Sequence, residues 1–167
     1  MPIGDPMGGD AYDLGRGRLK RIWMATVPVT DLEEAADWYR SALGLDILYD
    51  RRADNWIEMG MIGQDARIAL YVPKEGEERM PGIDTGIMFA TESIFEVHRR
   101  LVDEGVVFVV KPKKQSWGGL LIVFLDPFGN RLGVIEDAPR PAVEAHKVGE
   151  GEGKRDTGVT IRTIVTK

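Results

Sequence analysis

The chain has 167 residues and a formal net charge of −5, from 22 Lys and Arg against 27 Asp and Glu. This length is sufficient for one domain of ordinary size with its own hydrophobic core. The sequence contains no cysteine, which excludes disulfides, thiolate metal ligands and a cysteine nucleophile. Nucleic-acid-binding domains are usually basic, so the acidic balance leads us to expect no nucleic-acid partner.

The sequence also lacks the features of membrane and secreted proteins. No apolar run approaches the ~18 residues that a membrane span requires. Residues 1–18 are rich in Gly, Asp and Pro and lack the apolar segment of a secretory signal, so we expect a flexible arm there. The sequence therefore predicts a cytoplasmic protein without a membrane partner.

Residues 19–73 contain the first group of regular elements. Strand-like runs occupy 21–29, 45–50, 56–61 and 67–72. After the first run, Thr30-Asp31-Leu32-Glu33 fits a capping box with Thr30 as the cap, and apolar residues then recur at helical spacing. Gly44 is expected to end this helix. The predicted order is strand, helix and three strands.

The same order recurs after a charged linker at 74–84. Strands are predicted at 85–90, 106–110, 120–125 and 131–136, and a helix at 93–104, while 111–114 (KPKK) is predicted to be a solvated loop. Leu32 aligns with Ile94 and Gly44 with Gly105, a shift of 62 or 61 residues. The sequence thus predicts an α+β fold of two tandem βαβββ modules, about 19–73 and 85–137, whose curved mixed or antiparallel sheets surround a cavity.

The C-terminal extension, residues 138–167, has two parts. Residues 138–156 have the Pro, Gly and charge content of a linker. Residues 159–165 are β-prone, although their alternation breaks at Ile164-Val165. Two interpretations remain open: a disordered end, or an added edge strand on one of the sheets or on a partner's sheet.

Two groups of residues resemble a known superfamily. VPVTDLE at 27–33, WY at 38–39 and ALGL at 42–45 resemble the opening of vicinal oxygen chelate proteins, which include glyoxalase I, extradiol dioxygenases and bleomycin-resistance proteins. DPFGN at 126–130, preceded by WG at 117–118, is similar to the turn before their last strand. The resemblance covers about residues 19–137 and implies the glyoxalase/bleomycin-resistance fold.

The resemblance also implies four strand positions for a divalent metal, which here hold Met24, Ala69, Gly86 and Gly133. Divalent ions of this kind need imidazole or carboxylate ligands, and a thioether is a weak substitute. The two histidines do not help, because His98 is expected to be a solvated helix residue and His146 lies in the tail. We therefore expect no metal site and no cofactor.

If the family geometry holds, strand alternation places small and aromatic side chains around the cavity. The predicted ligand-binding residues are Met24, Thr26, Trp56, Ala69, Tyr71, Gly86, Met88, Trp117, Arg131 and Gly133. The three at former metal positions with small side chains, Ala69, Gly86 and Gly133, are expected to enlarge it. Trp23 and Phe89 have the opposite parity and are assigned to the core.

Three functions compete. The leading hypothesis is a metal-independent protein that binds or sequesters a bulky aromatic small molecule, such as a natural product or antibiotic. The second is a metal-free lyase, isomerase or hydrolase that uses Glu58 as general acid or base. The third is a metalloenzyme with relocated ligands. The resemblance also implies a homodimer, with module pairing within or between chains left open.

Overall fold

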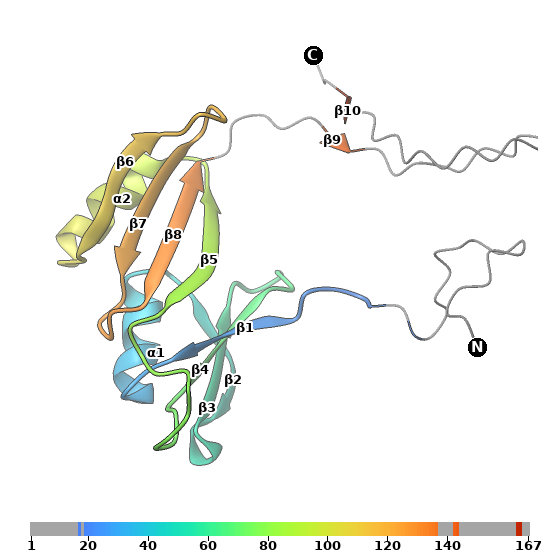
Figure 1. The fold of residues 1–167 in the computed structure, drawn as a ribbon, viewed down its shortest axis with the longest axis vertical. Helices are drawn as coiled ribbons and strands as arrows, with labels where there is room; N and C mark the ends of the chain where they lie inside the picture. The colour runs from blue at the N-terminus through green and yellow to red at the C-terminus, as the bar shows by residue number, and fades with distance from the viewer. Residues whose placement is uncertain (1–16, 18, 137–141, 144–162, 165–167) are drawn as a thin grey trace, which may run out of the picture. The chain divides into compact units, whose positions relative to one another are not determined.

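A computed structural model gives the structure of the protein and describes residues 17, 19–136, 142–143 and 163–164. The chain divides into two compact units, here called the first module (residues up to Glu77) and the second module (residues from Glu78). The first module contains β1 (Met24–Pro28), α1 (Leu32–Ser41), β2 (Asp46–Arg51), the 3₁₀ turn η2 (Arg52–Asp54), β3 (Trp56–Gly60) and β4 (Arg67–Tyr71) (Figure 1). The second contains β5 (Asp84–Thr91), α2 (Ile94–Asp103), β6 (Phe108–Lys114), β7 (Leu120–Leu125) and β8 (Arg131–Glu136).

The first module is a four-stranded mixed sheet with one helix against it. The strand order is β1-β4-β3-β2, in which β1 is parallel to β4 and the other neighbours are antiparallel. Helix α1 packs against β2, β3 and β4 through the buried residues Ala35, Ala36 and Tyr39. On the sheet, Ile57 and Leu70 are also fully buried. The register pairs these two residues directly across β3 and β4, on the face that packs on the helix.

The second module repeats this architecture, as the tandem repeat in the sequence predicts. Its order is β5-β8-β7-β6, again with the first strand parallel to the last. Helix α2 lies across β6, β7 and β8 in Figure 1 and buries Ile94 and Leu101. Ile122 and Phe124 of β7 are completely buried. The predicted α+β fold of two βαβββ modules is therefore confirmed.

The two helices begin in different ways. The predicted cap at Thr30 is wrong by one residue, because the Asp31 carboxylate accepts a hydrogen bond from the backbone N–H of Glu34 at 2.9 Å. Ser93 makes no side-chain cap bond at the start of α2. Instead the carboxylate of Glu136, on β8, accepts a hydrogen bond from the backbone N–H of Ile94 at 2.7 Å. A negative charge at this end also stabilises the helix dipole.

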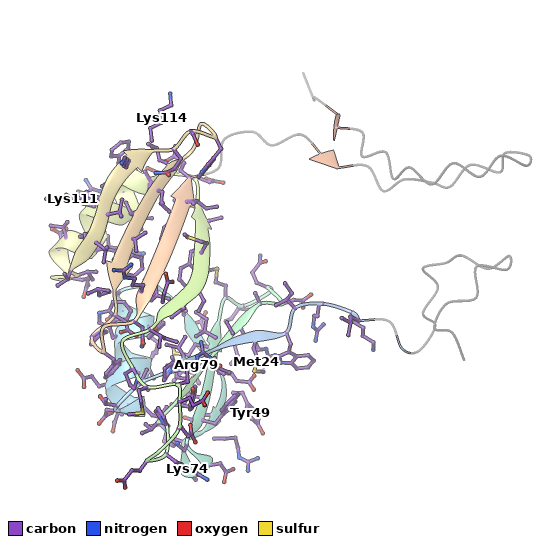
Figure 2. All side chains as sticks on the ribbon, viewed as in Figure 1. Met24, Tyr49, Lys74, Arg79, Lys111 and Lys114 are labelled. Atoms are coloured by element: carbon purple, nitrogen blue, oxygen red, sulfur yellow. The ribbon has the colours of Figure 1, made fainter. Side chains whose placement is uncertain are left out.

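The prediction of a loop at 111–114 is wrong, because these residues continue β6 to Lys114. Strand β6 is an edge strand, where the missing N–H of Pro112 costs no ladder hydrogen bond if it faces away from β7. Lys111 and Lys114 are exposed and point away from the strand (Figure 2). Lysines on an edge also discourage pairing with another chain's strand.

Two aromatic residues differ from their predicted environments. His98 is not a solvated helix residue: its ring lies 4.6 Å from that of Phe108, centroid to centroid, and its buried Nε2 has no hydrogen-bond partner among the described residues. Trp23 is not in the core, because it lies before β1 and is 51% exposed. In both cases tertiary packing, rather than the local strand or helix pattern, determines how far the side chain is buried.

The Asp-Pro-Phe-Gly-Asn segment forms the turn between β7 and β8. Oδ1 of the buried Asp126 accepts hydrogen bonds from the backbone N–H groups of Phe128 (2.9 Å) and Asn130 (2.8 Å). Oδ1 of Asn130, also buried, accepts from the backbone N–H groups of Gly82 (2.9 Å) and Ile83 (3.2 Å). The motif therefore stabilises the turn and ties it to the chain entering β5.

Part of the C-terminal extension is described. Strand β9 (Ala142–Val143) pairs antiparallel with β10 (Thr163–Ile164) in a separate two-stranded sheet, so β10 is not an added edge of either four-stranded sheet. The other residues of the predicted linker and β-prone segment lie outside the described residues, as does the N-terminal arm except Gly17. None of the described helices has the length and apolar character needed to cross a membrane.

Candidate functional site

The candidate site is the face of the first module's sheet that α1 does not cover, called here its open face. Strand register places alternate residues of β1, β4, β3 and β2 on this face: Met24, Thr26, Arg67, Ala69, Tyr71, Trp56, Glu58, Gly60, Tyr49 and Arg51. Six of them are residues that the sequence predicts as site candidates. The structure therefore brings together Met24, Thr26, Trp56, Glu58, Ala69 and Tyr71.

Glu58 lies at the centre of a polar group on this face and is only 8% exposed. Its Oε1 accepts a hydrogen bond from Nε1 of Trp56 at 3.1 Å, and its Oε2 accepts one from Nη1 of Arg67 at 2.6 Å. A buried carboxylate requires such partners, and its pairing with a guanidinium is a strong, charge-assisted one. Both oxygens are already engaged, so the geometry makes Glu58 a residue that positions Trp56 and Arg67.

Trp56 and Tyr71 form the aromatic part of the face. They are opposite each other on β3 and β4, with ring centroids 6.4 Å apart and planes inclined by 31°. The hydrogen bond to Glu58 fixes the orientation of the indole. Two neighbouring rings, one of them held in place, provide an apolar surface suited to a planar ligand group.

Arg67 is a member of this site that the sequence interpretation missed. Its side chain is 32% exposed, and its guanidinium lies 5.9 Å from the ring centroid of Trp23. A second guanidinium, that of Arg21, lies 4.6 Å from the same ring and pairs with Asp65 at 3.7 Å. The available signal was parity, because Arg67 is two residues before Ala69 on a strand already assigned to this face.

The open face of the second module is apolar. Met88, Gly133 and Val123 are in register across β5, β8 and β7, and Ala90, Ile135 and Leu121 form the next row. Arg131 pairs with Leu125 at the end of these strands and is exposed. Of the predicted site residues, Met88, Arg131 and Gly133 lie on this face.

The two glycines of this module that are predicted to enlarge a cavity, Gly86 and Gly133, differ in their surroundings. A Cβ added at Gly133 would overlap Sδ of Met88, so the space above Gly133 is filled by that side chain. Gly86 has open space around its Cβ position, but its φ of +68° is unfavourable for any other residue. It lies where the pairing of β5 with β8 is irregular, between Asp84 and Met88.

Trp117 lies in the hairpin that joins β6 to β7. A Cβ at Gly119 would overlap the indole of Trp117, so the ring packs against this glycine. Trp117 is 46% exposed. The indole therefore remains accessible on the second module.

The side chains at the four positions where the resemblance implies metal ligands do not fit a divalent ion. Met24 offers a thioether and Ala69 a methyl group, while Gly86 and Gly133 have no side chain. Among residues 19–136, no group of three or more His, Asp or Glu side chains is arranged to hold a metal. Glu58, on the same face as Ala69, is instead paired with Arg67.

Two surface hollows lie elsewhere. One, of about 900 Å³, is lined by residues at the start and outer side of α2, and another, of about 630 Å³, is lined by the end of α1 and the start of β2. Neither is lined by any of the predicted site residues. At the exposed end of β2, hydrogen bonds from the side chain and backbone of Arg52 lower the pKa of Asp50. This ion pair is separate from the Glu58 group.

Comparisons with known proteins identify a family. The model of the Glyoxalase/Bleomycin resistance protein/Dioxygenase superfamily matches residues 21–134. A crystal structure of a member of this superfamily from Sphaerobacter thermophilus DSM 20745 shares 31% identity and a TM-score of 0.65, covering 71% of this chain and 98% of that one. TnmS3, an antibiotic binding protein from Streptomyces sp. CB03234, shares 26% identity and a TM-score of 0.64, covering 72% and 98%. No curated protein matches the chain.

Proposed function

We propose that this chain, which belongs to the Glyoxalase/Bleomycin resistance protein/Dioxygenase superfamily, binds a bulky, planar aromatic small molecule without a metal ion. The observation that supports this most is the open face of the first module. It combines the Trp56–Tyr71 pair with a buried, fully paired Glu58, while Met24 and Ala69 occupy superfamily metal positions.

Affinity on such a face comes from apolar and aromatic contact. Stacking on an aromatic ring adds about 0.5–1.5 kcal/mol beyond the area buried. Replacing a metal-ligating imidazole or carboxylate by Ala69 removes a polar group that a small chelating ligand would use. The likeness to an antibiotic binding protein at 26% identity supports a natural product or antibiotic as the ligand class.

A second candidate is metal-free acid–base catalysis by Glu58. Its burial favours this, since a carboxyl group at 8% exposure is the kind that enzymes use as a general acid or base. The engagement of both its oxygens by Trp56 and Arg67 favours the binding function instead. Turnover of a bound compound, lost in Glu58→Gln, would replace the binding proposal by the catalytic one.

The test is binding with and without a metal. Full-length protein is titrated with polycyclic aromatic natural products, and Trp fluorescence is followed before and after EDTA treatment and with added Ni²⁺, Zn²⁺, Mn²⁺ or Fe²⁺. We expect micromolar binding that none of these treatments changes, and well under one equivalent of metal in purified protein. A stoichiometric metal ion, or binding that EDTA abolishes, would contradict the proposal.

We also propose that the protein is a homodimer. Apart from β6, whose lysines discourage pairing, the edge strands are β1 and β2 in the first module and β5 in the second. Open edges favour pairing or coverage by another chain. Sedimentation equilibrium at micromolar concentration should give twice the chain mass of 18.6 kDa, and a monomer mass would exclude this assembly.

A further inference from the structure

We propose that Arg67 is the polar anchor of the first module's open face, and that the ligand is a planar aromatic compound with a neutral acceptor oxygen, such as a ketone, beside its ring. This inference rests on the proposed function, because it takes the Trp56–Tyr71 surface as the place where the ring lies. On this proposal Arg67 makes the site bind aromatic compounds that have such an oxygen more tightly than compounds of similar size that lack it.

The first observation is the unused donor capacity of Arg67. A guanidinium has five N–H donors in a planar fork. Within the described part of the chain, Nη1 donates to Glu58, and Nε and Nη2 have no hydrogen-bond partner. The side chain is 32% exposed, so these donors remain accessible. An acceptor oxygen on a ligand would satisfy them.

The second observation is that Arg67 is held in place. Its Nη1 lies 2.6 Å from Oε2 of Glu58, and the ring of Trp23 lies near its guanidinium, 5.9 Å from centroid to Cζ. Cation–π contact and an ion pair with a buried carboxylate both restrict the side chain. Binding then costs less conformational entropy, because the donor is already oriented.

The third observation is the shared carboxylate. Glu58 accepts from Arg67 through one oxygen and from the indole Nε1 of Trp56 through the other. The guanidinium and the edge of the indole are therefore fixed on either side of one carboxylate group. A ring stacked on Trp56 brings a substituent on its edge toward the donors of Arg67.

The charges on this face favour a neutral oxygen over an anion. Arg67 pairs with Glu58, and Arg21 pairs with Asp65, so the two guanidinium groups contribute no net positive charge to this region. A carboxylate placed on Arg67 would lie close to the negative Glu58, and the two would repel. A ketone oxygen accepts the same hydrogen bonds without this repulsion.

The experiment uses three probes of nearly equal size: 2-acetonaphthone, 2-naphthoate and 2-methylnaphthalene. Each is titrated into the ¹⁵N-labelled full-length protein, and the Trp56 Nε1–H and Arg67 Nε–H signals are followed by NMR. We expect both signals to shift with 2-acetonaphthone, and its Kd to be at least tenfold lower than that of 2-methylnaphthalene. 2-Naphthoate is expected to bind no more tightly than the ketone.

Variants separate the anchor from the aromatic surface. Arg67→Met combined with Glu58→Gln removes the donors without leaving a buried charge, and is expected to reduce ketone affinity to that of 2-methylnaphthalene, whose own Kd stays within threefold. Arg67→Lys keeps Glu58 paired and should lose at least threefold for the ketone, so it provides the result if the double variant does not fold. Arg40→Met, an exposed position on α1, is the matched control and should change nothing.

The outcomes distinguish the two proposals. If the ketone and the hydrocarbon bind equally, or if the Arg67 variants keep the tenfold preference, the anchor is refuted while aromatic binding on this face stands. A tighter Kd for 2-naphthoate overturns the neutral oxygen. If none of the probes shifts the Trp56 signal, binding on this face is refuted, and the proposed function fails together with the anchor.

Discussion

The two modules have the same topology, but the side chains on their open faces differ in chemistry. On the helix side, both contain a fully buried apolar set, such as Ile57 and Leu70 in the first module and Ile122 and Phe124 in the second. On the open side, the first has two aromatic rings and an ion pair between the buried Glu58 and the partly exposed Arg67, and the second has rows of apolar side chains with Met88 over Gly133. Packing on the helix fixes one face of each sheet, so the other face is where function can differ.

In each module an asparagine side chain forms hydrogen bonds with the backbone of a distant segment, but the two asparagines differ in burial. Asn130 is completely buried and accepts from the backbone N–H groups of Gly82 and Ile83. Asn55, half-buried at a φ of +62°, exchanges hydrogen bonds with the backbone of Val72. Both side chains tie a turn to the end or the beginning of a strand that is distant in sequence.

The largest effect is expected from Asn130→Ala. This change removes the acceptor of the Gly82 and Ile83 backbone N–H groups and a donor to the buried Asp126 carboxylate, which costs about 3 kcal/mol of unfolding free energy. Asn55→Ala should cost about 1–2 kcal/mol, because water can replace part of its bonding. Urea unfolding measures both, and equal losses would show that burial does not separate the two asparagines.

The next effect concerns which module binds the ligand. Trp56→Ala removes half of the aromatic pair and should weaken binding of a polycyclic ligand by about 2 kcal/mol, roughly thirtyfold. Trp117→Ala, on the second module's hairpin, is expected to change affinity by less than about threefold. The Kd values come from fluorescence titration, with circular dichroism to verify the fold. A larger loss for Trp117 would move the site to the second module.

A pair of glycines on the open faces should give smaller, unequal effects on stability. A Cβ at Gly60 would lie 2.9 Å from the backbone oxygen of Ala66 and 2.8 Å from Cδ1 of Leu48, so Gly60→Ala forces the backbone to move and should cost about 2 kcal/mol. At Gly133 the clash is with the flexible end of Met88, and Gly133→Ala should cost less than about 1 kcal/mol. Thermal unfolding compares them, and the reverse order would contradict this difference.

The smallest expected effect is a change in the pKa of Asp50, on the edge strand β2. Hydrogen bonds from Arg52 lower the pKa of Asp50 at the end of β2. The edge strand of the second module, β6, ends instead in two lysines, Lys113 and Lys114, and contains no acidic residue. Because the pKa of Asp50 is lower in the folded protein, its pairing with Arg52 stabilises the fold at pH values above the ordinary pKa of Asp. This stabilisation is lost as the pH falls through the lowered pKa. NMR titration of the Asp50 carboxyl should show a pKa that rises toward its ordinary value in Arg52→Ala. An unchanged pKa would remove Arg52 as the cause.

The sequence by itself determined the repeat, the order of elements and most strand positions. Strands at 120–125 and 131–136 match β7 and β8, because alternation and the flanking turn residues are local signals. The same alternation put Met24 on one face with Thr26 and Ala69 on one face with Tyr71, and the pairing of β1 with β4 brings these two faces together. The resemblance to the superfamily, rather than this alternation, implied metal positions that hold residues unsuited to a divalent ion.

Tertiary structure decided what those faces can do. Glu58 and Arg67 are nine residues apart in sequence, and only the pairing of β3 with β4 brings the carboxylate and the guanidinium together. The filling of the space above Gly133 by Met88 depends in the same way on the pairing of β5 with β8. Strand register and its irregularities are set by the packing of a whole module, so no local pattern in the sequence can supply them.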